Sequence, residues 1–159
     1  MMFKILKFSV LILLLYRFGL HAQDAREDAG YFTNPQSTPF GTVCSNNYSS
    51  SLYLVNNGSL EELLSAPGCG SYYTISYDGR FIGLKLVNED GSQVPAVYDL
   101  GERTIRTLGA SARQVGQISF SRKGRIAFTR GEMLVVIDGG KEQSYTIGTY
   151  ANLAPISPD

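Results

Sequence analysis

The sequence predicts an all-β fold: an incomplete β-propeller made of four-stranded antiparallel blades, about two of them full and the others partial. Three observations lead to this prediction. Two different motifs recur along the chain at intervals of about 40 residues. Each full repeat divides into four short segments separated by turn residues. After position 25, no stretch long enough for a helix shows clear helical periodicity.

The first recurring motif contains a short strand, a turn and the beginning of a second strand. ISYDGRFIG begins at Ile75, ISFSRKGRIAF begins at Ile118 and ISPD begins at Ile156. The pair Asp78-Gly79 suits a tight turn because glycine accepts a positive φ without steric cost. A motif of this kind that returns at this interval is typical of propeller blades.

The second recurring motif is a strand, a tight turn and another strand. It spans residues 51–64 (SLYLVNNGSLEELL), 95–108 (PAVYDLGERTIRTL) and 133–147 (MLVVIDGGKEQSYTI). In this alignment Tyr53, Val97 and Val135 occupy matching places. An antiparallel β-sandwich also uses short strands and turns, but it gives no reason for both motifs to return at similar intervals.

Four strands are expected in each full repeat. They cover residues 72–76, 81–87, 94–99 and 104–108 in one repeat, and 115–120, 125–129, 133–138 and 144–147 in the next. The predicted full blades therefore span residues 67–109 and 110–150. Residues 23–66 are expected to form an N-terminal segment and a partial first blade, and residues 151–159 the first strand of a truncated further blade. Since propellers need at least about four blades to close, we expect the front portion of a larger protein.

Residues 1–22 have the layout of a secretory signal peptide. MMFKILK supplies a positively charged start, FSVLILLL (8–15) is a short apolar core, and Ala22 offers a small residue at a cleavage point. The alternative is an uncleaved membrane anchor, but Arg17 interrupts the apolar run short of the ~20 residues that a spanning helix needs. We expect an exported protein, in the periplasm, at the cell surface or outside the cell, without a stable membrane span after cleavage.

Cys44 and Cys69 are the only cysteines in the chain. In an exported protein an even pair of cysteines favours a disulfide bridge. The alternative is that both are buried free thiols. Two cysteines without a nearby histidine do not predict a metal site.

The first motif resembles the repeat of the TolB-like, WD-repeat-like propellers of bacterial exported proteins. Their repeat is similar to Ile-Ser-Pro-Asp-Gly, two variable residues and then Ile-Ala-Phe. Residues 75–79, 118–119 and 124–128 carry the resemblance, while Pro158 holds the motif's proline position and Tyr77 replaces that proline earlier in the chain. The resemblance covers roughly residues 50–159. It implies a propeller fold, but a fold of this kind does not imply one function.

The predicted mature chain contains no histidine, because His21 lies inside the predicted signal peptide. This excludes Ser-His-Asp and Cys-His mechanisms as well as histidine metal sites. Glu61 and Glu62 are adjacent on a predicted strand, so their side chains point to opposite faces and cannot easily act together. We therefore expect no catalytic residue, no metal and no cofactor, and a chain that is not itself an enzyme.

Propellers usually bind ligands at the mouth of the central channel, where the first strands of the blades begin. Aligning the repeats places Ser71, Gln114 and Asn152 in one ring at this mouth. Arg113 lies one position earlier and Tyr72 one position later. These five residues are the candidate binding residues, and the alternative is that they are ordinary loop residues between blades.

The expected function is a noncatalytic binding or scaffold module whose partner is a protein or a small ligand. The alternative is the substrate-gating propeller of a larger exported hydrolase, similar to a prolyl-oligopeptidase-like peptidase, with its catalytic domain beyond Asp159. Nucleic acid is not an expected partner. The formal net charge is zero, and three of the cations, Lys4, Lys7 and Arg17, lie in the predicted signal peptide.

Overall fold

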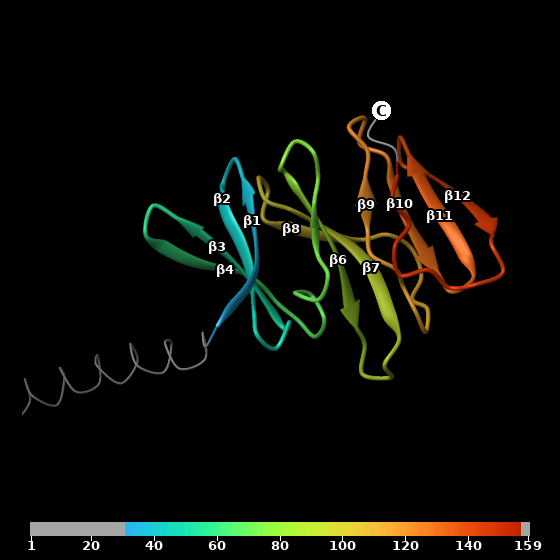
Figure 1. Cartoon of the computed structure of the whole chain (residues 1–159), viewed down its shortest axis with the longest axis horizontal. Coiled ribbons are helices and arrows are strands. Elements are labelled where there is room, and N and C mark those ends of the chain that lie inside the picture. The colour runs from blue at the N-terminus through green and yellow to red at the C-terminus, as the bar shows by residue number, and fades with distance from the viewer. Residues whose placement is uncertain (1–30, 157–159) are drawn as a thin grey trace, which may run out of the picture. The chain divides into compact units, whose positions relative to one another are not determined.

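The computed structural model describes residues 31–156, which fold into three four-stranded sheets without a helix (Figure 1). The first sheet contains β1 (Phe32–Thr38), β2 (Gly41–Asn46), β3 (Ser51–Asn56) and β4 (Ser59–Ser65). The second contains β5 (Thr74–Ile75), β6 (Phe81–Val87), β7 (Gln93–Asp99) and β8 (Thr104–Thr107). The third contains β9 (Ser119–Phe120), β10 (Ile126–Arg130), β11 (Met133–Asp138) and β12 (Lys141–Thr146).

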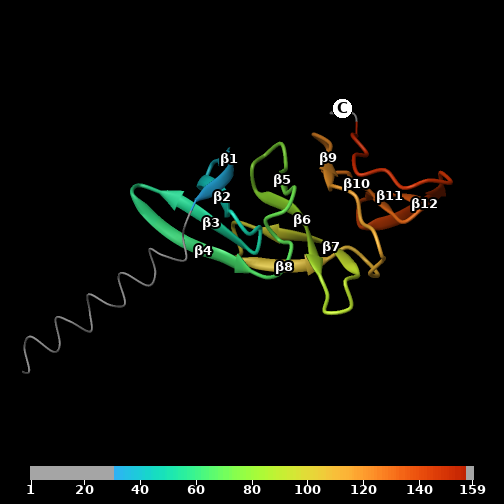
Figure 2. The ribbon, with the colours of Figure 1, turned by 60° about the horizontal axis from the view of Figure 1, so that its bottom comes forward.

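In each sheet the strands that are neighbours in space are also neighbours in sequence. A second view shows the three sheets following one another in chain order (Figure 2). Consecutive four-stranded sheets of this kind are the blades of a β-propeller. The prediction of an all-β, incomplete propeller is therefore confirmed.

Two apolar clusters join the sheets. The first cluster joins Val43, Leu52 and Leu54 of the first sheet to Ile82, Leu84, Ala96 and Tyr98 of the second. The second cluster joins Val97 of the second sheet to Phe120, Ile126, Phe128 and Val135 of the third. Since successive side chains of a strand point to opposite faces, β7 sends Ala96 and Tyr98 into one cluster and Val97 into the other. Full burial of each large apolar side chain contributes about 1.5–3 kcal/mol.

Gly83 lets the second and third sheets approach each other closely. A Cβ atom at this position would lie 2.6 Å from Cβ of Ile118 and 2.8 Å from Cε2 of Phe120, too close for any real contact. Beside it, Oγ1 of Thr74 donates a hydrogen bond to the carbonyl oxygen of Ile118 at 2.6 Å. Packing between the sheets, rather than a turn, therefore requires the glycine.

The first sheet corrects one sequence prediction, because it is a complete four-stranded sheet rather than a partial blade. The strands that sequence patterns missed are β1 and β2. β1 (FTNPQST) is mostly exposed, lacks apolar alternation and contains Pro35. A proline is tolerated there because β1 is an edge strand, where a backbone N–H is dispensable.

The alignment of the third strands was wrong by one residue. Val97 and Val135 were expected at matching places, yet they enter the second cluster from opposite sides, one from the second sheet and one from the third. Val136 is instead the residue that matches Val97. Val97 pairs with Gly83 on β6, and Val136 pairs with Ala127, which holds the matching place on β10. A shift of one residue reverses the face of a strand, and spacing alone does not reveal it.

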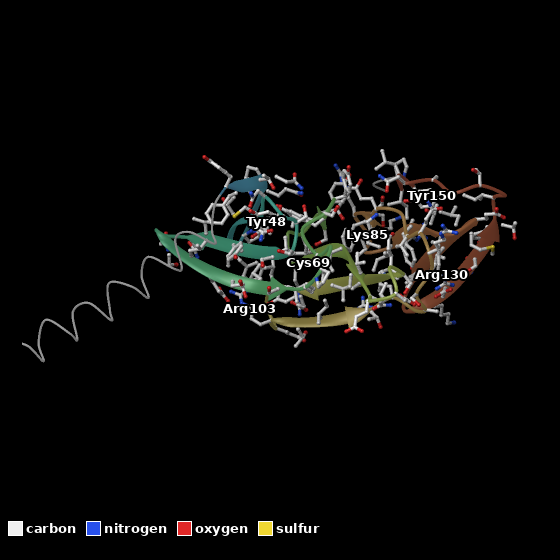
Figure 3. All side chains as sticks on the ribbon, turned by 90° about the horizontal axis from the view of Figure 1, so that it is seen from below. Tyr48, Cys69, Lys85, Arg103, Arg130 and Tyr150 are labelled. Carbon is white, nitrogen blue, oxygen red and sulfur yellow. The ribbon has the colours of Figure 1, made fainter. Side chains whose placement is uncertain are left out.

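The predicted bridge between Cys44 and Cys69 is not present, and both cysteines are free and buried. Cys69 belongs to the first cluster together with Val43, near the middle of the side chains drawn in Figure 3. Cys44 follows Val43 on β2, so its side chain points to the other face of that strand. Burial raises the pKa of both thiols, as expected for unreactive internal cysteines.

Residues 151–156 do not form a strand, although a first strand was expected at 151–159. They are nevertheless bound to the third sheet. Oγ1 of Thr129 donates a hydrogen bond to the carbonyl oxygen of Ala151. The N–H of Gln117 donates one to the carbonyl oxygen of Asn152 at 2.7 Å. Residues 157–159 and the predicted signal peptide at 1–22, with His21, lie outside the described residues. Within residues 31–156, no helix is long and apolar enough to cross a membrane.

Candidate binding hollow beside the first strands

A hollow of about 590 Å³ lies beside β1 and β5. Its walls come from β1, the end of β2 and the loop after it, the segment 70–74 that runs into β5, and Gln117 just before β9. Every residue that lines it is uncharged, and nearly all of them carry a hydroxyl or amide group. Such groups both donate and accept hydrogen bonds, so the hollow suits a neutral polar ligand or the main chain of a peptide.

Tyr73 anchors the floor of the hollow. Its side chain is almost fully buried, and its hydroxyl donates towards the carbonyl oxygens of Val43, at 3.0 Å, and Asn34. Nε2 of Gln36 donates to the carbonyl oxygen of Tyr73 at 3.1 Å. Burial raises the pKa of Tyr73, which keeps the phenol neutral. These bonds hold β1 against the segment that enters β5.

The backbone around the hollow is strained. Of the five non-glycine residues with positive φ in the described chain, three line it: Asn34 (φ 53°), Ser49 (φ 56°) and Tyr72 (φ 56°). Asparagine tolerates this conformation, but a bulky residue such as tyrosine rarely adopts it. Each such residue costs about 1–3 kcal/mol, and residues of this kind gather at ligand-binding sites.

Tyr72 is the large exposed group at the hollow. Its side chain is 62% exposed, and Nζ of Lys85 lies 5.9 Å from the centre of its ring. The left-handed backbone at Tyr72 directs the ring away from the core that holds its neighbour Tyr73. An exposed aromatic ring beside hydroxyl and amide groups provides a flat apolar contact for a bound molecule.

The structure separates the five residues predicted from the repeat alignment. Ser71 and Tyr72 line the hollow. Arg113 and Gln114 instead line a different hollow of about 680 Å³ beside the loop 90–93. Asn152 lines neither, although its carbonyl oxygen accepts the hydrogen bond from the N–H of Gln117, which lines the first hollow.

Sequence reasoning missed the hollow's residues on β1 and in the loop before β3, which include Asn34, Gln36 and Ser49. No repeat motif covers these residues, so no alignment pointed to them. Gln117 was also missed, although it precedes the recurring Ile118 directly. Its position next to the first strand of the third sheet is the one signal that would have indicated it.

Glu61 serves an ion pair and Asp90 serves a turn. Glu61 accepts two hydrogen bonds from Arg103, each at 2.9 Å, and Asp90 accepts one from the N–H of Ser92 at 2.9 Å. Within residues 31–156, no group of three or more histidine, cysteine, aspartate or glutamate residues is placed to hold a metal ion.

The fold is that of a partial TolB-like β-propeller. TolB from Acinetobacter baumannii superposes on 80% of this chain with a TM-score of 0.61 and 16% identity. The β-propeller domain of the Trilobed protease from Pyrococcus furiosus, described as having an open velcro topology, superposes on 72% with a TM-score of 0.54 and 13% identity. The matches span only 35% of the TolB chain and 42% of the protease propeller.

At these identities the likeness establishes the fold and not an activity. No family model matches the sequence, and no curated protein matches it.

Proposed function

We propose that this chain is a noncatalytic β-propeller module that binds a protein or a small ligand in the hollow beside β1 and β5. The observation that carries the proposal is the gathering there of three of the five left-handed non-glycine residues of the described chain. Strained backbone persists where the surrounding structure holds it in place, and it is concentrated at binding sites. Tyr72, at once strained and exposed, is the residue on which binding should depend most.

The preferred ligand is a peptide segment in an extended conformation. A peptide main chain offers one donor and one acceptor per residue, which matches the neutral hydroxyl and amide groups of the hollow. The ring of Tyr72 would pack against one side chain of the peptide. The apolar run at residues 8–15 supports export of the module, so that its partner would be a periplasmic, surface or extracellular protein.

The proposal is tested with peptides selected from a random display library on the purified protein. Their affinities are compared among the native protein, Tyr72→Asn and Tyr145→Asn. Asparagine tolerates the left-handed backbone at position 72, and Tyr145 is an exposed tyrosine on β12 away from the hollow. We expect Tyr72→Asn to weaken binding about tenfold or more and Tyr145→Asn to leave it unchanged. Equal affinity for all three proteins would refute the hollow as the binding site.

A second candidate is a propeller that controls access to the active site of a larger exported hydrolase. The likeness to the propeller domain of a protease favours it, since the two share a fold. The reading frame beyond Asp159 separates the two candidates. A Gly-x-Ser-x-Gly motif between a strand and a helix would support the hydrolase, and further repeats alone would support the binding module.

A further inference from the structure

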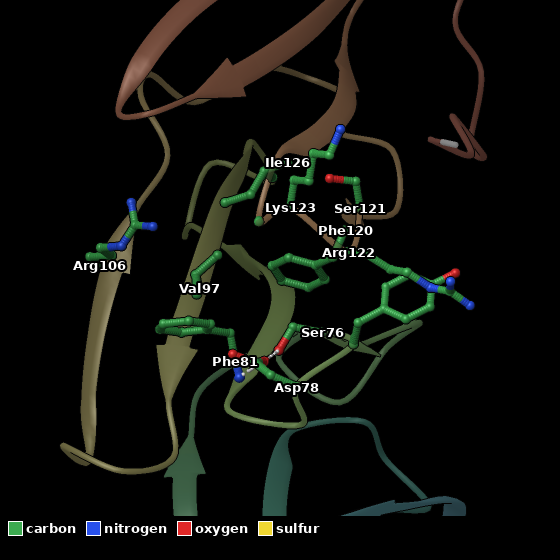
Figure 4. A pocket seen from close by; sticks show the side chains of 12 residues that line it. Ser76, Asp78, Phe81, Val97, Arg106, Phe120, Ser121, Arg122, Lys123 and Ile126 are labelled. Carbon is green, nitrogen blue, oxygen red and sulfur yellow. Dashed lines mark hydrogen bonds between the residues drawn. The ribbon is translucent and has the colours of Figure 1, made fainter. Parts of the chain in front are cut away.

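A third recess, of about 320 Å³, lies between the second and third sheets, at the end where β5 turns into β6 and β9 turns into β10. Its floor is apolar and consists of Phe81 and Val97 from one sheet and Phe120 and Ile126 from the other. Figure 4 shows this floor between Arg106 on one side and Arg122 on the other, with Lys123 above it. We call this recess the cationic groove.

Among residues 31–156, three cations that border the cationic groove have no carboxylate partner. The five ion pairs of the described chain involve Arg80, Arg103, Arg125 and Arg130, but not Arg106, Arg122 or Lys123. The guanidinium of Arg122 lies 5.4 Å from the ring centre of Tyr77, which positions it at the rim without neutralising it. The three cations of the rim are therefore not held in ion pairs.

Asp78 is the single acidic residue among those lining the groove, and its carboxylate is already engaged. It accepts hydrogen bonds from Oγ of Ser76 at 2.6 Å and from the N–H of Arg80 at 3.1 Å. These bonds, the one from Ser76 first, hold the pKa of Asp78 below its usual range. Asp78 thus shapes the turn and stays ionised, so the lining carries three cations against one carboxylate and keeps an excess of positive charge.

We propose that the cationic groove binds an acidic peptide segment that inserts one apolar side chain between the two sheets. The apolar floor provides the contact for that side chain, and the three cations contact acidic residues on either side of it. The apolar floor favours a peptide over nucleic acid, for which a basic surface without an apolar pocket would suffice. This proposal does not depend on the hollow at Tyr72, because none of the residues lining the groove lines that hollow.

The probe is a short fluorescein-labelled peptide of glutamates and aspartates with one central leucine. Two further peptides serve as comparisons: one with serine in place of leucine, and one with glutamine and asparagine in place of the acids. Fluorescence anisotropy measures binding to the native protein, to the triple variant Arg106→Gln, Arg122→Gln, Lys123→Gln, and to Lys141→Gln. Lys141 is an exposed lysine on β12 outside the groove and serves as the matched control.

We expect the acidic leucine peptide to bind the native protein and Lys141→Gln equally, and the triple variant about tenfold more weakly or worse. Both comparison peptides should bind more weakly, and added salt should weaken the binding of the acidic peptide. Because the three substituted side chains are exposed, the triple variant should keep its fold, which circular dichroism checks.

Four results would overturn the proposal. They are equal binding to the triple variant, equal binding of the peptide without acids, no binding of the acidic peptide at millimolar concentration, and loss of binding in Tyr72→Asn. Loss of binding in Tyr72→Asn would assign the peptide to the hollow beside β1 and β5. Binding of the protein to vesicles that contain phosphatidylserine is measured as well. Binding to these vesicles without binding to the acidic peptide would show a lipid site instead.

Discussion

The ammonium group of Lys85 is buried and donates a hydrogen bond to the carbonyl oxygen of Val115 at 2.8 Å. The bond ties β6 to the segment that leads into β9, and Figure 3 places Lys85 between the second and third sheets. No ion pair of the described chain includes Lys85. The third sheet has a corresponding bond with a neutral donor. There the hydroxyl of Thr129 on β10 donates to the carbonyl oxygen of Ala151, in the segment that follows the sheet.

Replacing Lys85 with methionine should raise the free energy of unfolding at pH 7 by about 1 kcal/mol. Methionine is one atom shorter than lysine and fills most of the same space, and it removes a charge whose dehydration costs more than one hydrogen bond and a distant ring contact contribute. Urea unfolding of both proteins measures the difference.

The pH dependence provides the check on Lys85. Burial lowers the pKa of Lys85, so the folded state binds fewer protons than the unfolded state between that lowered pKa and about 10.4. Native stability should therefore rise relative to Lys85→Met as the pH increases through this window. A constant difference up to pH 10 would mean that the buried ammonium is not destabilised by its surroundings.

Tyr73→Phe should lower the free energy of unfolding by about 1–3 kcal/mol at pH 7. It deletes the hydroxyl that bonds to Val43 and leaves a buried carbonyl oxygen with one partner fewer. Burial raises the pKa of Tyr73, so its contribution is complete below about pH 10 and is lost as the pH rises above that value. The stability difference between the native protein and Tyr73→Phe should thus shrink above pH 10, as urea titrations at several pH values will show.

Asp99→Asn should destabilise the protein by roughly 1 kcal/mol, more than Asp138→Asn does. The carboxylate of Asp99 accepts bonds from Nε and Nη2 of Arg80, at 2.7–3.1 Å, whereas Asp138 accepts one from Arg125 at 2.8 Å. Both arginines directly follow a turn glycine, and both aspartates end the third strand of their sheet.

Acid should remove the difference in stability between the native protein and Asp99→Asn. The hydrogen bond from Arg80 holds the pKa of Asp99 below its usual range. Its contribution is therefore present above about pH 4 and disappears as the pH falls through the lowered pKa. Thermal unfolding at pH 7 and at pH 3 compares the three proteins, and an equal loss from both substitutions would contradict the assignment.

Tyr72→Gly should stabilise the fold and weaken binding at the same time. Glycine adopts the left-handed backbone freely, so relief of strain should raise the free energy of unfolding by about 1 kcal/mol. Loss of the exposed ring should reduce affinity for peptides selected on the native protein. A variant that is less stable than the native protein would show that the ring contributes more to packing than its exposure indicates.

The strands that sequence analysis predicted well are those with the strongest patterns. β6, β7, β10 and β11 are central in their sheets and bounded by glycine turns, and all but β11 are largely buried. Their predicted limits differ from the observed ones by one residue or less. β1 contains a proline and is mostly exposed, so neither hydrophobic alternation nor strand propensity predicted it. Its position became clear only from its pairing with β2.

The binding residues were predicted less well because repeats transfer strand positions and not loop paths. Tyr72 and Gln114 were aligned as near equivalents, yet the chain approaches β5 and β9 along different routes. The route to β5 passes Gly70, whose backbone lies close to Ser45 and Ser49, while the route to β9 forms bridges with Gln93 and Arg130. Contacts of this kind depend on tertiary packing, which no local pattern in the sequence encodes.

Gly83 also bears on the geometry of a complete ring. The missing side chain brings β6 next to Ile118 of the following sheet, and this contact limits how widely two successive blades can splay near their first strands. The angle between these two blades depends on that spacing. A methyl group at position 83 would therefore push these two blades apart at this end and change the angle between them, as well as weaken this one interface.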